Sequence, residues 1–285
     1  MPYQPPEPFL SRFVGNRGYN NEEVNRVAAI RSMWPYLAGE LKLSERDFRI
    51  MGDLYNAEVA LADSCVGQII EHLRASGLLD DTVVILTSDH GENLGEHGRI
   101  DHHLSMYETT LHIPLMIRYP KAFQPGSRIS DFVSTVDIAP TVMDLCDTGK
   151  SVERLKSAET SLARSDRQHR AFVVAGNERP LAGIGLMRER YPKFDSSAID
   201  YRVRAIRTEP YKLIWNVGGA VELFDLQTDP GELHDISDKE LEMRNKLHKM
   251  LKVWMERLPL AGDVSFLEGQ DEESMKILRS LGYVK

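Results

Sequence analysis

Carboxylates and imidazoles gather in one short stretch of the chain, residues 89–103. Eight of its side chains could bind a metal ion or an anion: Asp89, His90, Glu92, Glu96, His97, Asp101, His102 and His103. Carboxylate oxygen and imidazole nitrogen are common ligands of divalent ions. The Asp89-His90 pair alone has a structural alternative, in which it only caps the following turn. The density of the stretch, together with three interspersed glycines that permit close backbone approach, favours a metal or anion site over a solvated loop.

A strand and a long helix are expected to position this stretch. Residues 83–86 have the length and β-branching of a fully buried strand, and Asp89 and His90 follow where it would end. Ligands of open parallel sheets bind at that end of the strands. From Glu45 to about Ser76, apolar residues recur at every third or fourth position. This spacing predicts a long amphipathic helix before the strand, with Ser44 as its N-cap.

The order of the remaining elements predicts an α/β fold. Before the long helix, a short helix is expected after the N-cap Asn20. After residues 89–103, the patterns predict a strand at 113–117, an extended piece at 132–136, and a helix at 138–145 capped by Asp137. Short strands at 171–175, 201–207, 211–217 and 221–225 predict a small antiparallel sheet. Helices are expected at about 239–257 and 272–281.

Three parts follow from this order. Residues 1–147 are expected to form an α/β domain, and the polar, weakly patterned residues 148–169 a connecting segment. Residues 170–285 are expected to form a small α+β subdomain. Within it, residues 176–200 offer four cations as anion contacts, which we interpret as a solvated surface rather than a specificity pocket: Arg179, Arg188, Arg190 and Lys193.

Composition excludes several classes of partner. The 285 residues carry a formal net charge of −8, and no basic tract is present, which argues against a non-specific nucleic-acid binder. No apolar stretch approaches the roughly 20 residues that span a bilayer, and the first residues do not resemble a signal peptide, so no membrane partner is expected. Cys65 and Cys146 belong to no CxxC motif. No feature of the sequence indicates a particular cellular compartment.

Several segments together resemble the sulfatases of the alkaline phosphatase superfamily. The strings that carry the resemblance are TSDHGENLGEHG, the His102-His103 pair, MYE, HIPLMI, RAIRTEPYKLIWN, ELFDLQTDPGELHDIS and the closing LRSLGYV. They cover nearly the whole chain from Pro2 onward. The resemblance implies part of a doubly wound sheet with helices on both faces, followed by a small C-terminal antiparallel-sheet subdomain with terminal helices.

The resemblance also implies roles for four residues. Asp89 and His90 would bind a divalent metal ion, most simply Ca²⁺, with Mn²⁺ or Mg²⁺ as alternatives. A lysine usually follows the GEHG motif in the family and touches the sulfate and the leaving-group oxygen. Counting forward from Gly98 places His102 there, whereas counting back from Glu108 places His103; we favour His102 as the substrate or acid residue. His97 is expected to be a structural hydrogen-bonder.

The sequence departs from the family at the nucleophile. Sulfatases of this type carry Cys or Ser in a C/S-x-P-x-R motif, which is converted to formylglycine, and no such motif occurs in this sequence. The first metal-ligand pair of the family is also missing. We therefore expect the C-terminal portion of a sulfatase-like enzyme that acts on a sulfate-ester small molecule or glycan, inactive by itself. Strand 83–86 would then lack neighbours in its sheet, and self-association through the exposed edge is expected.

Two other interpretations remain. A phosphodiesterase, phosphonate hydrolase or phosphoethanolamine transferase of the same superfamily would share the SDHGE-like element, and most of its distinguishing residues would lie outside this sequence. The imidazole pair, MYE and HIPLMI favour a sulfatase over a transferase. A non-catalytic binding protein would use Asp89, His90 and the other histidines only to stabilise a loop. A stability change on metal titration would separate the second interpretation from a metal centre.

Overall fold

The computed structural model describes residues 3–146, 160–167 and 169–257. Its helices are α1 (Phe9–Val14), α2 (Asn21–Ala28), α3 (Trp34–Leu37), α4 (Glu45–Ala75), α5 (Glu108–Leu111), α6 (Ile138–Leu145), α7 (Leu181–Arg190) and α8 (Leu241–Glu256), with 3-10 turns η1 (Glu96–Gly98), η2 (Thr135–Asp137) and η5 (Ser196–Ile199). Its strands are β1 (Val84–Thr87), β2 (Asn93–Leu94), β3 (Ile100–Asp101), β4 (Leu115–Arg118), β5 (Val173–Asn177), β6 (Val203–Arg207), β7 (Tyr211–Asn216) and β8 (Val221–Asp225).

The chain divides into two compact units between Lys239 and Glu240. All elements except α8 belong to the first unit. The predicted connecting segment 148–169 stays a prediction, because residues 147–159 lie outside the described part of the chain. The helix predicted at 272–281 also lies outside it. The predicted helix at 239–257 is confirmed as α8.

The long helix α4 is confirmed, and its start is fixed by side chains. Ser44 Oγ accepts a hydrogen bond from the Asp47 backbone N–H, and the Asp47 carboxylate accepts one from the Ser44 N–H, which completes a capping box. Asn20 and Glu23 form the same arrangement at the start of α2. In each case two backbone donors that would lack a helical partner are satisfied, so both helices begin where the sequence predicts.

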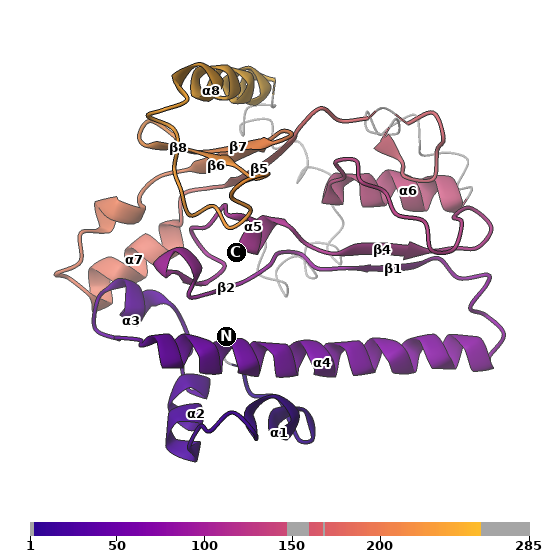
Figure 1. Ribbon diagram of the computed structural model, residues 1–285, viewed down its shortest axis with the longest axis horizontal. Helices are drawn as coiled ribbons and strands as arrows, with labels where there is room; N and C mark the ends of the chain where they lie inside the picture. The colour runs from indigo at the N-terminus through magenta and orange to yellow at the C-terminus, as the bar shows by residue number, and fades with distance from the viewer. Residues whose placement is uncertain (1–2, 147–159, 168, 258–285) are drawn as a thin grey trace, which may run out of the picture. The chain divides into compact units, whose positions relative to one another are not determined.

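Strand β1 differs in its surroundings from the expected buried strand of a parallel sheet. It pairs antiparallel with β4, with Val84 opposite Arg118 and Thr87 opposite Leu115. The two strands lie side by side in Figure 1. Val84, Ile85 and Leu86 are only half-buried and Thr87 is exposed. Among the described residues β4 is the single strand that pairs with β1. The expectation of full burial is wrong, because none of the four β1 side chains is fully buried.

The predicted small antiparallel sheet is confirmed. Strands β5, β6, β7 and β8 hydrogen-bond in that order, each antiparallel to the next. Figure 1 shows them stacked as a meander. Together with the helices and β1–β4, this sheet gives the mixed α/β architecture that the sequence predicts. Four consecutive side chains of β7, from Lys212 to Trp215, are buried.

Two apolar cores hold residues 89–107 in place. One core joins α4, through Ile50, Met51 and Leu54, to Ile100 and Leu104, and also takes in α7. The other joins Met106 and Tyr107 to β6, β7 and β8. The C-terminal end of the polar stretch is therefore anchored by buried apolar side chains, on one side to α4 and on the other to the sheet.

The helix at 138–145 begins as predicted, but Asp137 does not cap it. The Asp137 carboxylate accepts from the Ser134 N–H, one residue ahead of η2, and also pairs with Arg170. Asp137 is completely buried, and this pairing offsets the cost of burying its charge. The predicted N-cap role is therefore wrong, because a 3-10 turn precedes the helix and takes the carboxylate.

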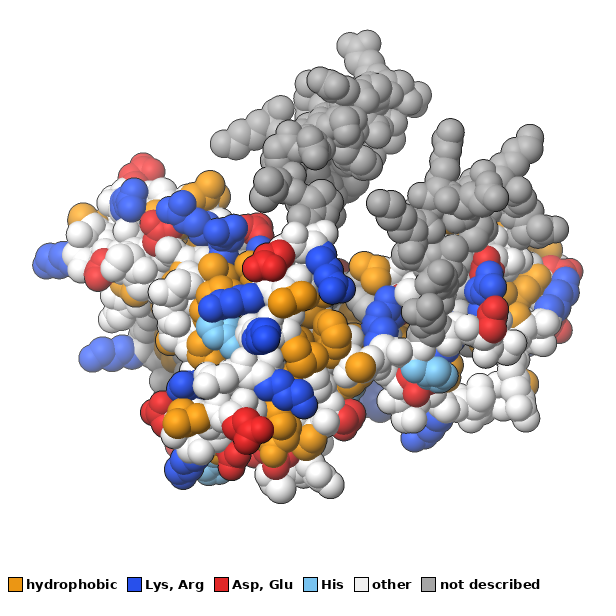
Figure 2. Space-filling model, turned by 90° about the horizontal axis from the view of Figure 1, so that it is seen from above, with side chains coloured by type: hydrophobic (Ala, Val, Ile, Leu, Met, Phe, Trp, Pro, Cys, Tyr) orange, Lys and Arg blue, Asp and Glu red, His pale blue; other side chains and the backbone are white. Residues whose placement is uncertain are grey.

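The surface drawn in Figure 2 carries basic, acidic and apolar side chains interspersed with one another. No helix in the described residues combines the length and the apolar character needed to cross a membrane.

Candidate functional site

Asp89 and His90 follow the end of β1, and their side chains approach one another. The His90 backbone N–H donates to Asp89 Oδ1 at 2.9 Å, and His90 Nε2 lies 3.5 Å from Asp89 Oδ2. His90 Nδ1 lies 2.8 Å from the carbonyl oxygen of Gly91, which can only accept, so Nδ1 carries a proton. A neutral ring then presents the Nε2 lone pair next to the Asp89 carboxylate. The carboxylate is 86% exposed and the imidazole 40% exposed.

The backbone after His90 packs closely against the chain before β4. The Gly91 N–H donates to Thr110 O at 2.9 Å, and a Cβ on Gly91 would lie 2.1 Å from Thr109 O. Only glycine allows this approach. Asn93 is completely buried; its amide donates to Asp101 O at 2.5 Å and accepts from Thr109 Oγ1 at 2.7 Å. These contacts fix the spacing between the two ends of the polar stretch.

Glu92 orients His102. Its Oε1 accepts from the Tyr3 hydroxyl at 2.8 Å, and its Oε2 lies 3.1 Å from His102 Nδ1. Both oxygens therefore have a partner inside the protein. Burial, followed by the Glu92 charge, raises the pKa of Tyr3 above its ordinary value, so the phenol stays a hydrogen-bond donor. The hydrogen bond to Glu92 raises the pKa of His102.

Asp101 orients both histidines that follow it. Its Oδ1 lies 2.7 Å from His103 Nδ1 and accepts from the His102 backbone N–H at 2.6 Å. Burial alone would raise the pKa of Asp101, but these donors outweigh it and hold the pKa at about 2. Asp101 and Leu104 both adopt positive φ, at 71° and 59°, so the chain turns sharply on either side of the histidine pair.

Three imidazoles form a stack. The ring centroids of His90 and His102 lie 3.8 Å apart, and those of His102 and His103 lie 4.5 Å apart. Carboxylates hold Nδ1 of His102 and His103, and within the described part of the chain their Nε2 atoms make no hydrogen bond. The side chains of His102 and His103 are 32% and 48% exposed. The stack therefore presents imidazole nitrogens to a ligand that arrives from solvent.

Glu96 and His97 belong to the turn and not to the stack. Glu96 Oε2 accepts from the Leu94 N–H at 2.6 Å. The sequence predicts a hydrogen-bonding role for His97. Its ring instead stacks on that of Tyr107, with the two ring centroids 3.6 Å apart. Burial lowers the pKa of His97, so its ring is held neutral against the phenol.

Two groups of three side chains each bring ligand atoms close enough together to hold a divalent ion. The groups are His90 with Glu92 and His102, and Asp101 with His102 and His103, and the ligand atoms within each lie within 4.8 Å of one another. In both groups the carboxylates already accept hydrogen bonds from histidines or from Tyr3, as described above. Asp89 belongs to neither group, but its Oδ2 faces His90 Nε2, and His90 Nδ1 donates to Gly91 O on the far side of the ring. This matches the way metal-binding histidines are usually held.

The structure thus brings together three of the four predicted site residues in one stack, with Asp89 beside it. Sequence reasoning missed the roles of four further residues: Tyr3, Glu92, Asn93 and Asp101. Glu92 and Asp101 belong to the polar stretch, and their spacing from His102 is a signal that could have found them. Tyr3 comes from 89 residues away, and no local pattern indicates it.

Comparisons with known proteins give one family. The family model for Sulfatase matches residues 5–148. Arylsulfatase K from Bos taurus is 33% identical over 214 residues, covering 74% of this chain and 38% of that protein. N-acetylglucosamine-6-O-sulfatase from Bacteroides thetaiotaomicron is 32% identical over 208 residues, covering 71% of this chain and 35% of that protein. The chain spans about two fifths of the length of such curated relatives.

Solved structures agree with the family. One, solved in complex with D-glucosamine-2-N,6-O-disulfate as its substrate, is 28% identical, has a TM-score of 0.59 and matches 80% of this chain and 45% of that chain. The phosphonate monoester hydrolase of Agrobacterium radiobacter is 25% identical, has a TM-score of 0.62 and matches 90% of this chain and 55% of that chain. The fold is therefore similar in proteins whose names point to sulfur and to phosphorus esters.

Proposed function

Because the chain belongs to the sulfatase family, we propose that residues 89–103 form part of a centre that hydrolyses sulfuric esters. The observation that carries the proposal is the stack of three imidazoles beside Asp89, with each ring held by a defined acceptor on Nδ1. Rings held in this way present their Nε2 edges in a fixed orientation, which suits recognition of a compact anion. The proposed substrate is a sulfate ester of a small molecule or a glycan.

Asp89 and His90 are the proposed metal ligands. Their Oδ2 and Nε2 atoms approach within 3.5 Å, and the carboxylate and imidazole are exposed enough to be reached by an ion. A carboxylate in the pair favours a hard divalent ion, and Ca²⁺ is proposed ahead of Mn²⁺ or Mg²⁺. When bound, such an ion offsets negative charge on an ester oxygen.

His102 is the proposed contact to the sulfate group or its leaving oxygen, with His103 as the alternative. Glu92 and Asp101 hold His102 Nδ1 from two sides, at 3.1 Å each, so the ring cannot turn without losing both contacts. His103 Nδ1 has only Asp101, and its ring is more exposed. The more tightly held ring is the better positioned of the two.

A second candidate reaction is hydrolysis of phosphonate or phosphate monoesters. It is favoured by the match to a phosphonate monoester hydrolase over 90% of this chain. Sulfate and phosphate esters present similar tetrahedral oxyanions, and imidazoles recognise both. Residues 89–103 do not distinguish the two reactions.

The proposal is tested with the 285-residue chain by calorimetric Ca²⁺ titration and by assays with aryl sulfate and aryl phosphonate. We expect Ca²⁺ binding that is lost in Asp89→Asn and kept in Asp63→Asn, an exposed carboxylate on α4. We expect no turnover by this chain alone, because its sequence contains no C/S-x-P-x-R motif for formylglycine. Absence of Ca²⁺ binding would contradict the metal site. Metal-dependent turnover of aryl sulfate would contradict the expected lack of a nucleophile, and turnover of phosphonate alone would favour the second candidate.

A further inference from the structure

A hydrogen bond from Tyr3 reaches the polar stretch from 89 residues away in sequence. The Tyr3 hydroxyl donates to Glu92 Oε1 at 2.8 Å. The Glu92 side chain is only 9% exposed, and among the described residues its carboxylate has two hydrogen-bonding partners, Tyr3 and His102. Little water can take the place of the phenol. The orientation of this carboxylate therefore depends on Tyr3 on one side and on His102 on the other.

Tyr3 is itself held by α4. Its ring meets the ring of Tyr55 edge to face, with the centroids 5.6 Å apart and an angle of 82° between the two planes. The backbone N–H of the next residue, Gln4, donates to Glu58 Oε1 at 2.8 Å. Tyr55 and Glu58 lie three residues apart in α4, so they face the same side of the helix. The position of the Tyr3 hydroxyl is thus set by the helix and not by Glu92 alone.

A glutamate side chain does not fix its own carboxylate, because rotation about its last bond has only broad minima. The two carboxylate oxygens move together in that rotation. While the Tyr3 hydroxyl holds Glu92 Oε1, Oε2 stays 3.1 Å from His102 Nδ1. Without the phenol the carboxylate is free to turn, and its hydrogen bond to the imidazole weakens. Tyr3 therefore acts on His102 through Glu92.

The consequence for His102 is the location of its proton. A carboxylate can only accept, so the proton of the neutral ring lies on Nδ1, which faces Glu92 and also Asp101, each at 3.1 Å. Nε2 is then the nitrogen at which His102 can take a proton from, or give one to, an ester oxygen. A carboxylate that keeps a histidine in one tautomer has the same effect in Ser-His-Asp sites.

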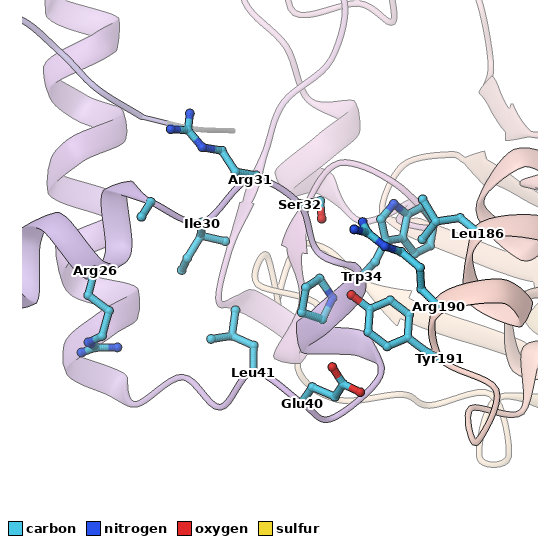
Figure 3. Close-up of a pocket in the computed structure, with 12 residues that line it drawn as sticks. Arg26, Ile30, Arg31, Ser32, Trp34, Glu40, Leu41, Leu186, Arg190 and Tyr191 are labelled. Atoms are coloured by element: carbon cyan, nitrogen blue, oxygen red, sulfur yellow. The ribbon is translucent and has the colours of Figure 1, made fainter.

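The opposite end of the imidazole stack offers no such support. The Trp34 ring, whose centroid lies 6.1 Å from that of His103, lines a pocket of 840 Å³ together with the end of α7 (Figure 3). Neither Glu92 nor His102 lines this pocket. An indole carries a donor and no acceptor, so Trp34 cannot hold the Nδ1 proton of an imidazole. The rings are therefore oriented by the carboxylates and by the groups that hold those carboxylates.

We propose that Tyr3 is a positioning residue for His102. Its hydroxyl fixes the Glu92 carboxylate, which keeps the imidazole proton on Nδ1 and leaves Nε2 for the ester. This inference rests on the proposed function only in taking the ester as the ligand of His102, because the effect of Tyr3 on the ring is measured without substrate. It makes residues 3 and 4, together with the middle of α4, part of what orients the candidate site.

The test measures histidine tautomers by ¹H–¹⁵N NMR of the 285-residue chain, without Ca²⁺ and at one alkaline pH at which the imidazoles are uncharged. Tyr3→Phe keeps the ring against Tyr55 and removes only the hydroxyl. We expect the ratio of the Nδ1–H to the Nε2–H tautomer of His102 to fall about fivefold, the effect of weakening one hydrogen bond to a charged group. His103, which is held by Asp101, is expected to keep its ratio.

The matched control is Tyr19→Phe. The Tyr19 hydroxyl also donates to a carboxylate, that of Asp53 in α4, at 2.9 Å, and this pair makes no hydrogen bond to Glu92. We expect the His102 ratio to be unchanged in Tyr19→Phe. Glu92→Ala tests the route, because it should lower the ratio at least as far as Tyr3→Phe does. Adding Tyr3→Phe to Glu92→Ala should lower the ratio no further, since a residue that acts through Glu92 has no effect once Glu92 is removed.

An unchanged His102 ratio in Tyr3→Phe would overturn the inference, and so would an equal fall in Tyr19→Phe. A further fall when Tyr3→Phe is added to Glu92→Ala would show that Tyr3 acts by packing and not through Glu92. If Tyr3→Phe does not fold, Glu92→Ala decides, because an unchanged ratio there contradicts the role of the carboxylate.

Ca²⁺ titration of the unchanged chain separates the two proposals. Absence of Ca²⁺ binding together with the expected tautomer changes contradicts the metal site only. Normal Ca²⁺ binding together with unchanged tautomers contradicts the role of Tyr3 only.

Discussion

Two clusters of ionisable side chains differ in how far they are exposed to solvent. The first is the imidazole stack with Asp89, Glu92 and Asp101. The second, which we call the Lys212 cluster, consists of Glu108, Arg207, Lys212 and Glu232. In the first cluster the histidine side chains are up to 48% exposed. In the second, Lys212 is completely buried and Glu232 is 2% exposed.

The Lys212 cluster satisfies its charges internally. Lys212 Nζ donates to Glu108 Oε1 at 2.9 Å, and Arg207 donates to Glu108 Oε2 at 2.7 Å. Lys212 Nζ also lies 2.7 Å from Glu232 Oε1, within ion-pair distance although not aligned for a hydrogen bond. Glu232 Oε2 accepts from the Glu108 backbone N–H at 2.6 Å. These contacts tie α5, directly after the histidine pair, to β6, β7 and the chain that follows β8.

The difference shows which cluster can act on a ligand. In the imidazole stack, carboxylates hold Nδ1 of His102 and His103, and the Gly91 carbonyl holds that of His90. In the Lys212 cluster every charged group faces an opposite charge, and Lys212 and Glu232 are buried. The pKa values follow the same division. Hydrogen-bond donors outweigh burial at Asp101 and hold its pKa at about 2, whereas burial dominates at Glu232 and raises its pKa. The buried Lys212 cluster is therefore suited to supporting the fold, and the exposed stack is the site at which we propose chemistry.

The largest effect is expected from removing the centre of the Lys212 cluster. Lys212→Met leaves Glu108 and Glu232 with less compensation in a buried environment, and we expect a loss of about 3 to 5 kcal/mol in the free energy of unfolding. Urea unfolding measures it. Lys193→Met, at an exposed lysine, serves as the control and is expected to change stability by less than about 0.5 kcal/mol. A loss in Lys212→Met no larger than in the control would show that the buried cluster does not support the fold.

A smaller loss is expected at the amide that closes the polar stretch. Asn93→Ala removes the donor to Asp101 O and the acceptor for Thr109, which leaves buried polar groups without partners. We expect a loss of about 2 to 3 kcal/mol and weaker Ca²⁺ binding, although Asn93 touches no proposed ligand. Unchanged Ca²⁺ affinity in a folded Asn93→Ala chain would mean that the stack does not depend on this support.

Acid should weaken the fold through Asp101. The folded-state pKa of about 2 lies below the ordinary value of about 3.9, so the stabilisation is fully present above about pH 4 and is lost as the pH falls towards 2. The expected contribution is about 2 to 3 kcal/mol. Urea unfolding of the unchanged chain and of Asp101→Asn should therefore differ most at pH 6, and the two should converge as the pH falls towards 2. A difference that does not depend on pH would contradict the hydrogen bonding described for Asp101.

The opposite pH dependence, and the smallest effect, is expected at Glu232. Burial raises its folded-state pKa above the ordinary value of about 4.3, so the contribution of Glu232 to stability is greatest below about pH 4 and declines as the pH rises through the folded-state pKa. Between pH 4 and 7, the unchanged chain should lose stability relative to Glu232→Gln. If the unchanged chain instead gained stability over that range, the pKa of Glu232 would be lowered on folding, as that of Asp101 is. The two clusters would then not differ in their pH dependence.

Local patterns were enough to predict most of the elements. The spacing of apolar residues and Ser44 located α4, because capping and amphipathicity are properties of neighbouring residues. Strand β8 was predicted at 221–225 and lies there. The burial of β1 was not predicted correctly, because burial depends on which strands and helices cover it and not on its own composition.

The sequence was enough to predict the candidate site residues, but not the distant residues that hold them in place. Asp89, His90, His102 and His103 share one segment, so their proximity followed from sequence. A lysine is ordinarily exposed, yet Lys212 is buried because Glu108, 104 residues away in sequence, neutralises it. The contact between Trp34 in α3 and Gly183 in α7 is likewise one that no local pattern predicts. Contacts between residues far apart in sequence leave no local signal.

The central claim, that Asp89 and His90 present a metal site while the neighbouring charges do not, is tested most directly by NMR of the histidine side chains. With ¹⁵N-labelled histidine, Ca²⁺ is expected to shift the His90 Nε2 resonance most and to leave His97, stacked on Tyr107, nearly unchanged. The shift should disappear in Asp89→Asn and persist in Asp63→Asn. A Ca²⁺ response that is uniform over the histidines, or one that survives in Asp89→Asn, would contradict the account.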